Sequence, residues 1–382
     1  MGRPLLIGLT SPYFGAVFGG GEKYLGVTAE AVRDGFPGNV VEIAGAVPAD
    51  RERYEATLNL DLHGIQLVAN NRRVTPVHRL ANRLTPLRPL RNRVLASQAA
   101  RATARYDVHL AMAYRIPVHT RAQRTAILCQ FPYASREGVA EFERVICQSE
   151  YVRHWVRELW GRDAAVVHPP VELPAGGPEA AAKRPLILSV GRFFEGGHSK
   201  RHEVMVEAFR GLCEDGLEGW QLHLVGSVHE EGPHAGYFER VKARARGYPI
   251  RIHTDLSHQD LEDLYRSASV YWHAAGFGAE GGPPEALEHF GLTVAEAMAH
   301  ATVPVVYPGG GVAEVVHDKE DGFHWRDPRE LAEVTLRLVA DADLRRRVGA
   351  EAWRSARRFG RAEFKRRMLE ALRPLVEPAS GE

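Results

Sequence analysis

Short runs of Val, Ile and Leu recur along the chain, and longer stretches with helical spacing separate them. Such runs are typical of strands that are buried on both faces of a parallel sheet. The strands predicted in the first half are residues 5–9, 40–44, 108–111, 125–129, 145–148 and 164–168. Those of the second half are residues 186–190, 222–225, 250–253, 270–273 and 303–307. The pattern predicts two α/β units in tandem.

A segment rich in Pro, Gly and Ala separates the two series of strands. Its lack of periodicity indicates an interdomain linker at residues 171–185, between a first domain at 1–170 and a second at 186–360. From Asp341 onward the pattern is helical, with a break at Phe359 and Gly360, and a final helix at about 361–378 is expected to cross back to the first domain. Two doubly wound domains predict a ligand cleft between the carboxyl ends of their sheets.

The composition narrows the class of protein. Of 382 residues, 45% are hydrophobic and 25% are charged, which disfavours disordered and fibrous proteins. No apolar run approaches the roughly 18 residues of a membrane-spanning helix. The net charge of +1 offers no general attraction to nucleic acid, and the three widely spaced cysteines indicate reduced thiols and neither disulfides nor zinc ligands. A cytoplasmic protein is expected.

A glycine-rich loop follows the first predicted strand. It ends in Gly20 and Gly21, and a helix is expected to open at Glu22. Glycine lets backbone N–H groups approach a ligand closely, and a helix N-terminus favours an anion such as phosphate. The alternative is a flexible turn.

Basic residues follow the strand at 186–190. Arg192 and Lys200 lie in the loop before a helix predicted at 203–212, where they could converge on a pyrophosphate or simply be solvated. Farther on, Gly276, Gly278 and Gly281 formally match a dinucleotide-binding pattern. Pro283 and Pro284 delay the helix which that pattern requires, so an NAD-dependent oxidoreductase is the less favoured class.

The segment EHFGLTVAEAM, residues 288–298, follows these prolines. Gly291 can free the N-terminus of a helix predicted at about 292–299, so that backbone N–H groups face a phosphate. Glu288 and Glu296 flank this helix end, where carboxylates are suited to accept hydrogen bonds from sugar or ribose hydroxyls. The alternative is a pair of glutamates on a helix surface.

These segments, together with PGGGVAEVV at 308–316, resemble the retaining glycosyltransferases of the GT-B fold, family 4, also called glycosyl transferases group 1. The resemblance covers nearly the whole chain. It implies transfer of a hexose from a GDP- or UDP-linked sugar to a hydroxyl of a glycan, lipid-linked or small natural-product acceptor. It also implies retention of anomeric configuration and neither a catalytic metal nor a cofactor besides the donor. The first domain would bind the acceptor and the second the donor.

Residue roles follow from the same resemblance. Arg192 and Lys200 would neutralise the diphosphate, Glu296 would accept from the ribose, and Glu288 would contact the reacting face of the donor sugar. The implied catalytic residues are Glu288, Arg192 and Lys200. The implied donor-binding residues are Gly20, Gly21, Arg192, Lys200, Glu288, Phe290, Gly291, Leu292, Thr293 and Glu296.

The acceptor side departs from the family pattern. Many members carry a histidine near the reacting sugar, and the segment CQFP here resembles the His-Tyr-Pro segment of lipid-linked oligosaccharide mannosyltransferases, with Gln130 replacing His. Glutamine can bond a sugar hydroxyl but cannot act as a base. Gln130 and Tyr114 are the acceptor-side candidates. A protein that binds, hydrolyses or epimerises nucleotide sugars is therefore the alternative function.

Two further segments were weighed for function. Asp341, Ala342 and Asp343 form an Asp-x-Asp triplet, but they open the C-terminal helical region and are interpreted as a helix cap and not as metal ligands. Residues 70–105 are basic and contain no acidic residue. They predict either peripheral contact with the inner face of a membrane, or a phosphorylated acceptor, or a basic helical hairpin. The oligomeric state stays open.

Overall fold

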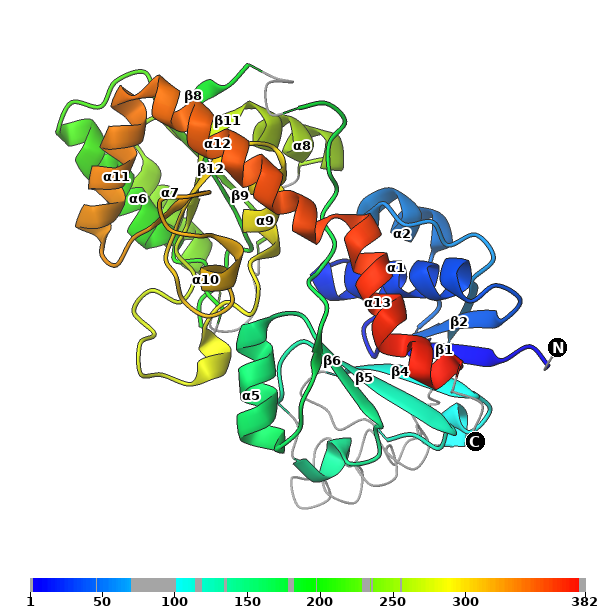
Figure 1. The fold of residues 1–382 in the computed structure, drawn as a ribbon. Coiled ribbons are helices and arrows are strands. Elements are labelled where there is room, and N and C mark those ends of the chain that lie inside the picture. Colours follow the sequence, from blue (N-terminus) through cyan, green and yellow to red (C-terminus); the bar gives the residue numbers. More distant parts are fainter. Residues whose placement is uncertain are drawn as a thin grey trace. The chain divides into compact units, whose positions relative to one another are not determined.

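A computed structural model describes residues 3–45, 47–69, 101–113, 119–133, 136–177, 182–196, 198–228, 234, 236–254 and 256–377. The chain forms two compact units (Figure 1). Unit 1 comprises Met1–Pro170 and Ala362–Glu382, and unit 2 comprises Val171–Arg361.

Unit 1 contains a sheet in the order β3-β2-β1-β4-β5-β6-β7, in which every pair is parallel. Its strands are β1 Leu6–Thr10, β2 Val40–Gly45, β3 Gln66–Ala69, β4 Val108–Ala113, β5 Arg124–Cys129, β6 Arg144–Cys147 and β7 Ala165–Val166. Its helices are α1 Gly20–Gly35, α2 Arg51–Leu58, the short 3-10 helix η2 Arg136–Val139, α5 Glu150–Trp160 and α13 Arg361–Val376.

Neighbouring residues of each central strand enter different cores, which explains the uninterrupted apolar runs. On β4, Leu110 packs on one face of the sheet, with α1 and α13, while Ala111 packs on the other, with α5. A strand that is buried on both faces has no polar position to alternate with.

The last helix belongs to unit 1, as the sequence predicted. Phe364 of α13 contacts Tyr24 of α1 edge to face, with ring centroids 5.0 Å apart. Lys365 pairs with Glu30 at 3.2 Å and with Asp34 at 2.9 Å. Apolar packing and ion pairs therefore hold α13 against α1.

Unit 2 has a second parallel sheet, in the order β10-β9-β8-β11-β12-β13. Its strands are β8 Arg184–Val190, β9 Gln221–Val225, β10 Ile250–His253, β11 Ala268–His273, β12 Val303–Val306 and β13 Phe323–His324. Its α-helices are α6 His202–Glu214, α7 Tyr237–Ala245, α8 His258–Ser267, α9 Leu292–Ala299, α10 Val312–Val315, α11 Pro328–Ala340 and α12 Ala342–Ala356. The described residues of this unit also form the 3-10 helices η4 Pro284–Ala286 and η5 Arg357–Phe359.

Both sheets are doubly wound, because the strand order reverses direction beside the first strand of each unit. The reversal lies between β1 and β4 in unit 1 and between β8 and β11 in unit 2. In such sheets, ligands bind outside the carboxyl ends of the strands at this point. In unit 2 the segments that begin at Gly191 and Ala274 occupy that position.

Every strand predicted from the sequence overlaps an observed strand. The edge strands β3 and β13 were not predicted. Helix α1 begins at Gly20, two residues earlier than expected, so Gly20 and Gly21 lie in its first turn and not before it. The predicted cap is confirmed, since the Asp341 carboxylate accepts a hydrogen bond from the Leu344 amide at 2.8 Å.

Candidate active site

The segment after β8 begins at Gly191, whose amide donates to the Val225 carbonyl at 2.8 Å. A Cβ atom at Gly191 would lie 2.4 Å from Cγ of Lys200. Glycine at this position therefore leaves room for the Lys200 side chain, which lies just before α6. Gly191 is therefore required for packing of a neighbouring side chain, a role that needs no contact with a ligand.

Lys200 and Glu288 form an ion pair at the carboxyl end of the unit 2 sheet. The Lys200 ammonium donates to Glu288 Oε2, and the two side chains are 19% and 15% exposed. His273, the last residue of β11, is 2% exposed and places its Nε2 atom 3.4 Å from the same carboxylate oxygen. Side chains from the loop after β8 and from the end of β11 thus meet on one carboxylate.

Electrostatics keep this carboxylate ionised. Burial by itself raises the pKa of Glu288, but the attraction of Lys200 and the contact with His273 outweigh that effect, and the pKa lies well below its usual range. Burial lowers the pKa of His273, which favours the neutral ring. The cluster therefore carries one buried negative charge and one buried positive charge.

The N-terminus of α9 lies three residues beyond Glu288. Gly291 caps it with a φ of +97°, a value that side-chain-bearing residues rarely adopt, and its carbonyl accepts from the amides of Val294 and Ala295. The amides of Leu292 and Thr293 have no partner within the helix. They are donors suited to an anionic group.

Tyr271 connects this helix end to β8. Its hydroxyl lies 2.7 Å from Thr293 Oγ1 and accepts from the Val190 amide at 3.3 Å. Burial raises the pKa of Tyr271, so the phenol stays protonated. The first turn of α9 is thereby positioned relative to the end of β8.

The glycines after β12 contact the Glu288 segment. Gly311 donates from its amide to the Glu288 carbonyl at 2.7 Å. A Cβ atom at Gly310 would lie 2.2 Å from the Glu288 carbonyl oxygen, and one at Gly311 would lie 2.2 Å from that of His289. The observed role of Gly310 and Gly311 is approach of the chain that carries Glu288.

The other predicted donor-side residues lie around this cluster without joining it. Glu296, inside α9, accepts from the Tyr265 hydroxyl at 3.0 Å. Phe290 is buried against Phe359, with ring centroids 5.2 Å apart. Arg192 is exposed, and its guanidinium lies 5.1 Å from the centre of the Phe194 ring.

The glycines at 276–281 do not open a helix. Gly276, Gly278 and Gly281 all have positive φ and form turns, and the next helical element is the three-residue η4. The structural context that a dinucleotide-binding pattern needs is therefore missing here.

The unit 1 candidates occupy separate positions. Gly20 and Gly21 lie in the first turn of α1, whose cap residue Gly19 offers no side chain. Gln130 follows β5, and its carbonyl accepts from the Gln148 side chain at 2.9 Å. Tyr114 lies outside the described residues, as does the basic segment except for residues 101–105.

The described residues contain neither a metal-binding cluster nor a membrane-spanning helix. No group of three or more His, Cys, Asp and Glu side chains in this part of the chain is arranged to hold a metal ion. No helix in the described ranges is long and apolar enough to cross a membrane.

His273 and Tyr271 were missed by the sequence analysis. Both lie at the carboxyl end of β11, a predicted strand, and there a polar or aromatic side chain faces the usual ligand position. Their position at the end of a predicted strand could have identified both residues from the sequence.

Comparison with known proteins finds similarity to several glycosyltransferases. Residues 177–354 match the family described as Glycosyl transferases group 1. A GDP-Man:Man(3)GlcNAc(2)-PP-Dol alpha-1,2-mannosyltransferase of Neurospora crassa is 27% identical over 62% of this chain and 46% of that protein. A D-inositol 3-phosphate glycosyltransferase of Xylanimonas cellulosilytica is 29% identical over 70% of this chain and 67% of that protein. The chain spans about half the length of the mannosyltransferases it matches.

Solved structures share the fold over nearly the full length. Sucrose-phosphate synthase of Thermosynechococcus elongatus has a TM-score of 0.71 at 19% identity, covering 97% of this chain and 99% of that one. The Anabaena protein HepE in complex with UDP-glucose has a TM-score of 0.69 at 15% identity, covering 96% and 99%. The fold predicted from the sequence is confirmed.

Proposed function

We propose that this protein transfers a hexose from a nucleotide diphosphate sugar to a hydroxyl acceptor, because residues 177–354 match the glycosyl transferases group 1 family and the chain has the GT-B fold. One observation carries the proposal. The buried Lys200–Glu288 pair lies at the switch point of the unit 2 sheet, three residues before the free N-terminus of α9.

The charges suit a departing nucleotide diphosphate. Negative charge grows on the phosphate as the bond to the sugar breaks, and donors held in place beforehand stabilise it without reorganisation. The ammonium of Lys200 and the amides of Leu292 and Thr293 would supply such donors. Arg192, exposed at the same end of the sheet, would add a second cation.

The carboxylates would bind hydroxyl groups. Glu288 is ionised and accepts from Lys200 through one oxygen, Oε2, so Oε1 is suited to accept from the donor sugar. Glu296 would accept from the ribose of the nucleotide. Gly20 and Gly21 of α1 would contact the donor from unit 1, and Gln130 and Tyr114 would contact the acceptor.

We further propose retention of anomeric configuration without a metal. The acceptor would attack from the side of the departing phosphate, which would take the acceptor proton. No side-chain base is needed on this route, which is compatible with glutamine at position 130. Measuring the anomeric configuration of the product by NMR, with and without EDTA, tests both points.

The donor is proposed to be GDP-mannose or a UDP-linked hexose. The first choice follows the name of the Neurospora relative, and the second follows the UDP-glucose complex of HepE. Thermal unfolding in the presence of UDP, GDP, ADP, TDP and NAD separates them. A ligand at one hundred times its Kd stabilises the folded protein by about 2.7 kcal/mol.

We expect one nucleotide diphosphate to raise Tm. Lys200→Met should reduce this rise in Tm. The control variant Lys319→Met, which removes an exposed lysine elsewhere in unit 2, should retain it. A rise with NAD alone would contradict the proposal. Incubation of the identified donor sugar without acceptor then separates transfer from hydrolysis, because a hydrolase releases free sugar at the same rate when no acceptor is present.

The acceptor class is proposed to include lipid-linked glycans, with residues 70–105 making contact with anionic lipid. Binding to vesicles should then increase with anionic lipid content and decrease with salt. Binding that is indifferent to lipid charge would contradict this part of the proposal.

A further inference from the structure

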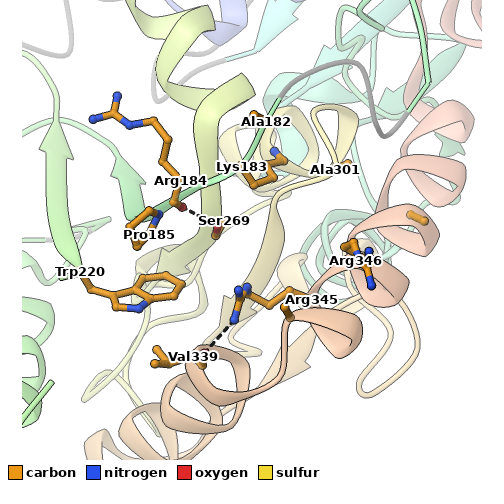
Figure 2. Close-up of a pocket in the computed structure, with 12 residues that line it drawn as sticks. Ala182, Lys183, Arg184, Pro185, Trp220, Ser269, Ala301, Val339, Arg345 and Arg346 are labelled. Atoms are coloured by element: carbon orange, nitrogen blue, oxygen red, sulfur yellow. Dashed lines mark hydrogen bonds between the residues drawn. The ribbon is translucent and has the colours of Figure 1, made fainter. Parts of the chain in front are cut away.

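A cavity of about 570 Å³ lies at the amino end of the unit 2 sheet, the edge opposite the Lys200–Glu288 pair (Figure 2). Its walls come from the segments that enter the strands and from the start of α12. The residues lining it include Lys183, Pro185, Trp220, Ala301, Val339 and Arg345. None of the predicted donor or acceptor residues lies in it.

Two cations face this cavity without a carboxylate partner. Lys183 donates to the His300 carbonyl at 2.7 Å and to Thr302 Oγ1 at 3.0 Å. Arg345 donates to the carbonyls of Leu338 and Val339, the second at 2.9 Å. Within the described residues, neither cation forms an ion pair. Each cation donates some of its N–H groups to neutral acceptors, and its other N–H groups can donate to a ligand.

The side chains are arranged around an open centre. Figure 2 shows the guanidinium of Arg345 directed toward Trp220 and the Arg184 side chain directed away from Arg345. The Arg345 guanidinium carbon lies 5.5 Å from the centre of the Trp220 ring, which is buried. Arg346 pairs with Asp343, whereas the Asp341 carboxylate caps α12. Asp341 also attracts Arg345 electrostatically, although the two side chains form no ion pair.

Unpaired cations in such a place are costly, and a bound anion offsets the cost. Burial lowers the pKa of Lys183 to about 7, as expected for an ammonium group without a counter-charge. Ala342, the first residue of α12, also lines the cavity, but the positive end of this helix is already matched by the Asp341 cap and by Asp343 in its first turn. Apolar groups of Pro185, Ala301 and Val339 complete the lining.

We propose that this cavity binds a small organic phosphate, separately from the nucleotide-sugar site. The two cations, Lys183 and Arg345, match the double negative charge of a phosphate monoester. The volume exceeds that of a bare phosphate ion and leaves room for a body of monosaccharide size against Trp220 and the apolar wall. The proposal does not depend on the transferase function.

Inorganic phosphate and ribose 5-phosphate are the probes, and Tm of the full chain is the readout, with sodium chloride at equal ionic strength as reference. Both probes should raise Tm above the reference, with ribose 5-phosphate acting at lower concentration. Lys183→Met and Arg345→Met should each weaken the binding of phosphate at least tenfold. Ala350→Met, which narrows the cavity and keeps every cation, should also weaken phosphate binding.

Two controls locate the bound anion. Arg329→Met removes an exposed charge of α11, and Lys200→Met removes the cation of the nucleotide-sugar site; both should keep the response. A response that disappears in Lys200→Met and persists in the cavity variants would overturn the proposal, as would no response in the unaltered protein. Since Lys183→Met can also weaken the contacts with His300 and Thr302, Ala350→Met keeps the test decisive if that variant fails to fold.

Discussion

Glu288→Gln removes the charge of the buried carboxylate while keeping its size and its ability to accept a hydrogen bond. In the unaltered protein, Lys200 donates to this carboxylate with its side chain only 19% exposed. The variant therefore leaves a largely buried ammonium group without a counter-charge. Lys200→Met leaves the converse, a carboxylate whose remaining neighbour is the neutral His273.

The magnitude follows from this burial. Removing one partner of a buried ion pair costs about 3–5 kcal/mol of the free energy of unfolding. The 15% and 19% exposure of the two side chains lets water reach them, so we expect about 3 kcal/mol for each single variant. The double variant leaves no unpaired charge, and it should be about 2 kcal/mol more stable than the sum of the single effects indicates.

Urea unfolding followed by tryptophan fluorescence measures these differences. Four of the six tryptophans, Trp220, Trp272, Trp325 and Trp353, belong to unit 2 and report on its unfolding. Since two units can unfold separately, the unit 2 transition is fitted by itself. Transfer is assayed in parallel, and all three variants should lose most of it.

The double variant separates structure from chemistry. Stability that is partly recovered, without recovery of transfer, identifies Glu288 and Lys200 as acting on the donor. Additive stability losses would refute the ion-pair argument. Full transfer activity in either single variant would refute the site.

Three further predictions concern other parts of the chain. Gly310→Ala should destabilise unit 2 by about 2 kcal/mol or more, since its Cβ meets the Glu288 carbonyl, whereas Gly216→Ala, also at positive φ but with open space around it, should cost less in the same urea assay. Burial lowers the pKa of His109 to about 3, below the 6.5 of the unfolded chain. The folded state therefore loses stability as the pH falls from 6.5 toward 3, by up to about 1.4 kcal/mol per pH unit, and is unaffected by this group above pH 6.5. His109→Gln should flatten the acid limb of the stability–pH curve of unit 1, and an unchanged limb would contradict this. Asp341→Ala should cost about 1 kcal/mol through loss of the α12 cap, and an unchanged Tm would count against it.

Local patterns predicted the central strands well. The segment 186–190 could be recognised because β8 is buried on both faces, which requires consecutive apolar residues. The edge strand β3 is only partly buried along its four residues and carries no such signature. The two-residue strand β13 is too short to show any period.

The sequence identified residues of the candidate site but did not predict the contacts between them. Lys200 and Glu288 were named from their loops and from a family resemblance, but their pairing joins positions 88 residues apart. His273 stood inside a predicted strand, where a buried histidine gives no sign of what it faces. The close approach of Gly310 to the chain that carries Glu288 likewise depends on tertiary packing.

The sequence by itself determined the two α/β units, the order of their strands along the chain and the loops in which anion-binding residues lie. These depend on periodicity and on glycine or proline at single positions, which are properties of short segments. Only the tertiary structure decided which charges meet, namely that Lys200 is paired while Lys183 and Arg345 face a cavity without a carboxylate. The reason is physical: the energy of a charge depends on its burial and on partners within a few ångströms, and sheet topology brings those partners from distant parts of the chain.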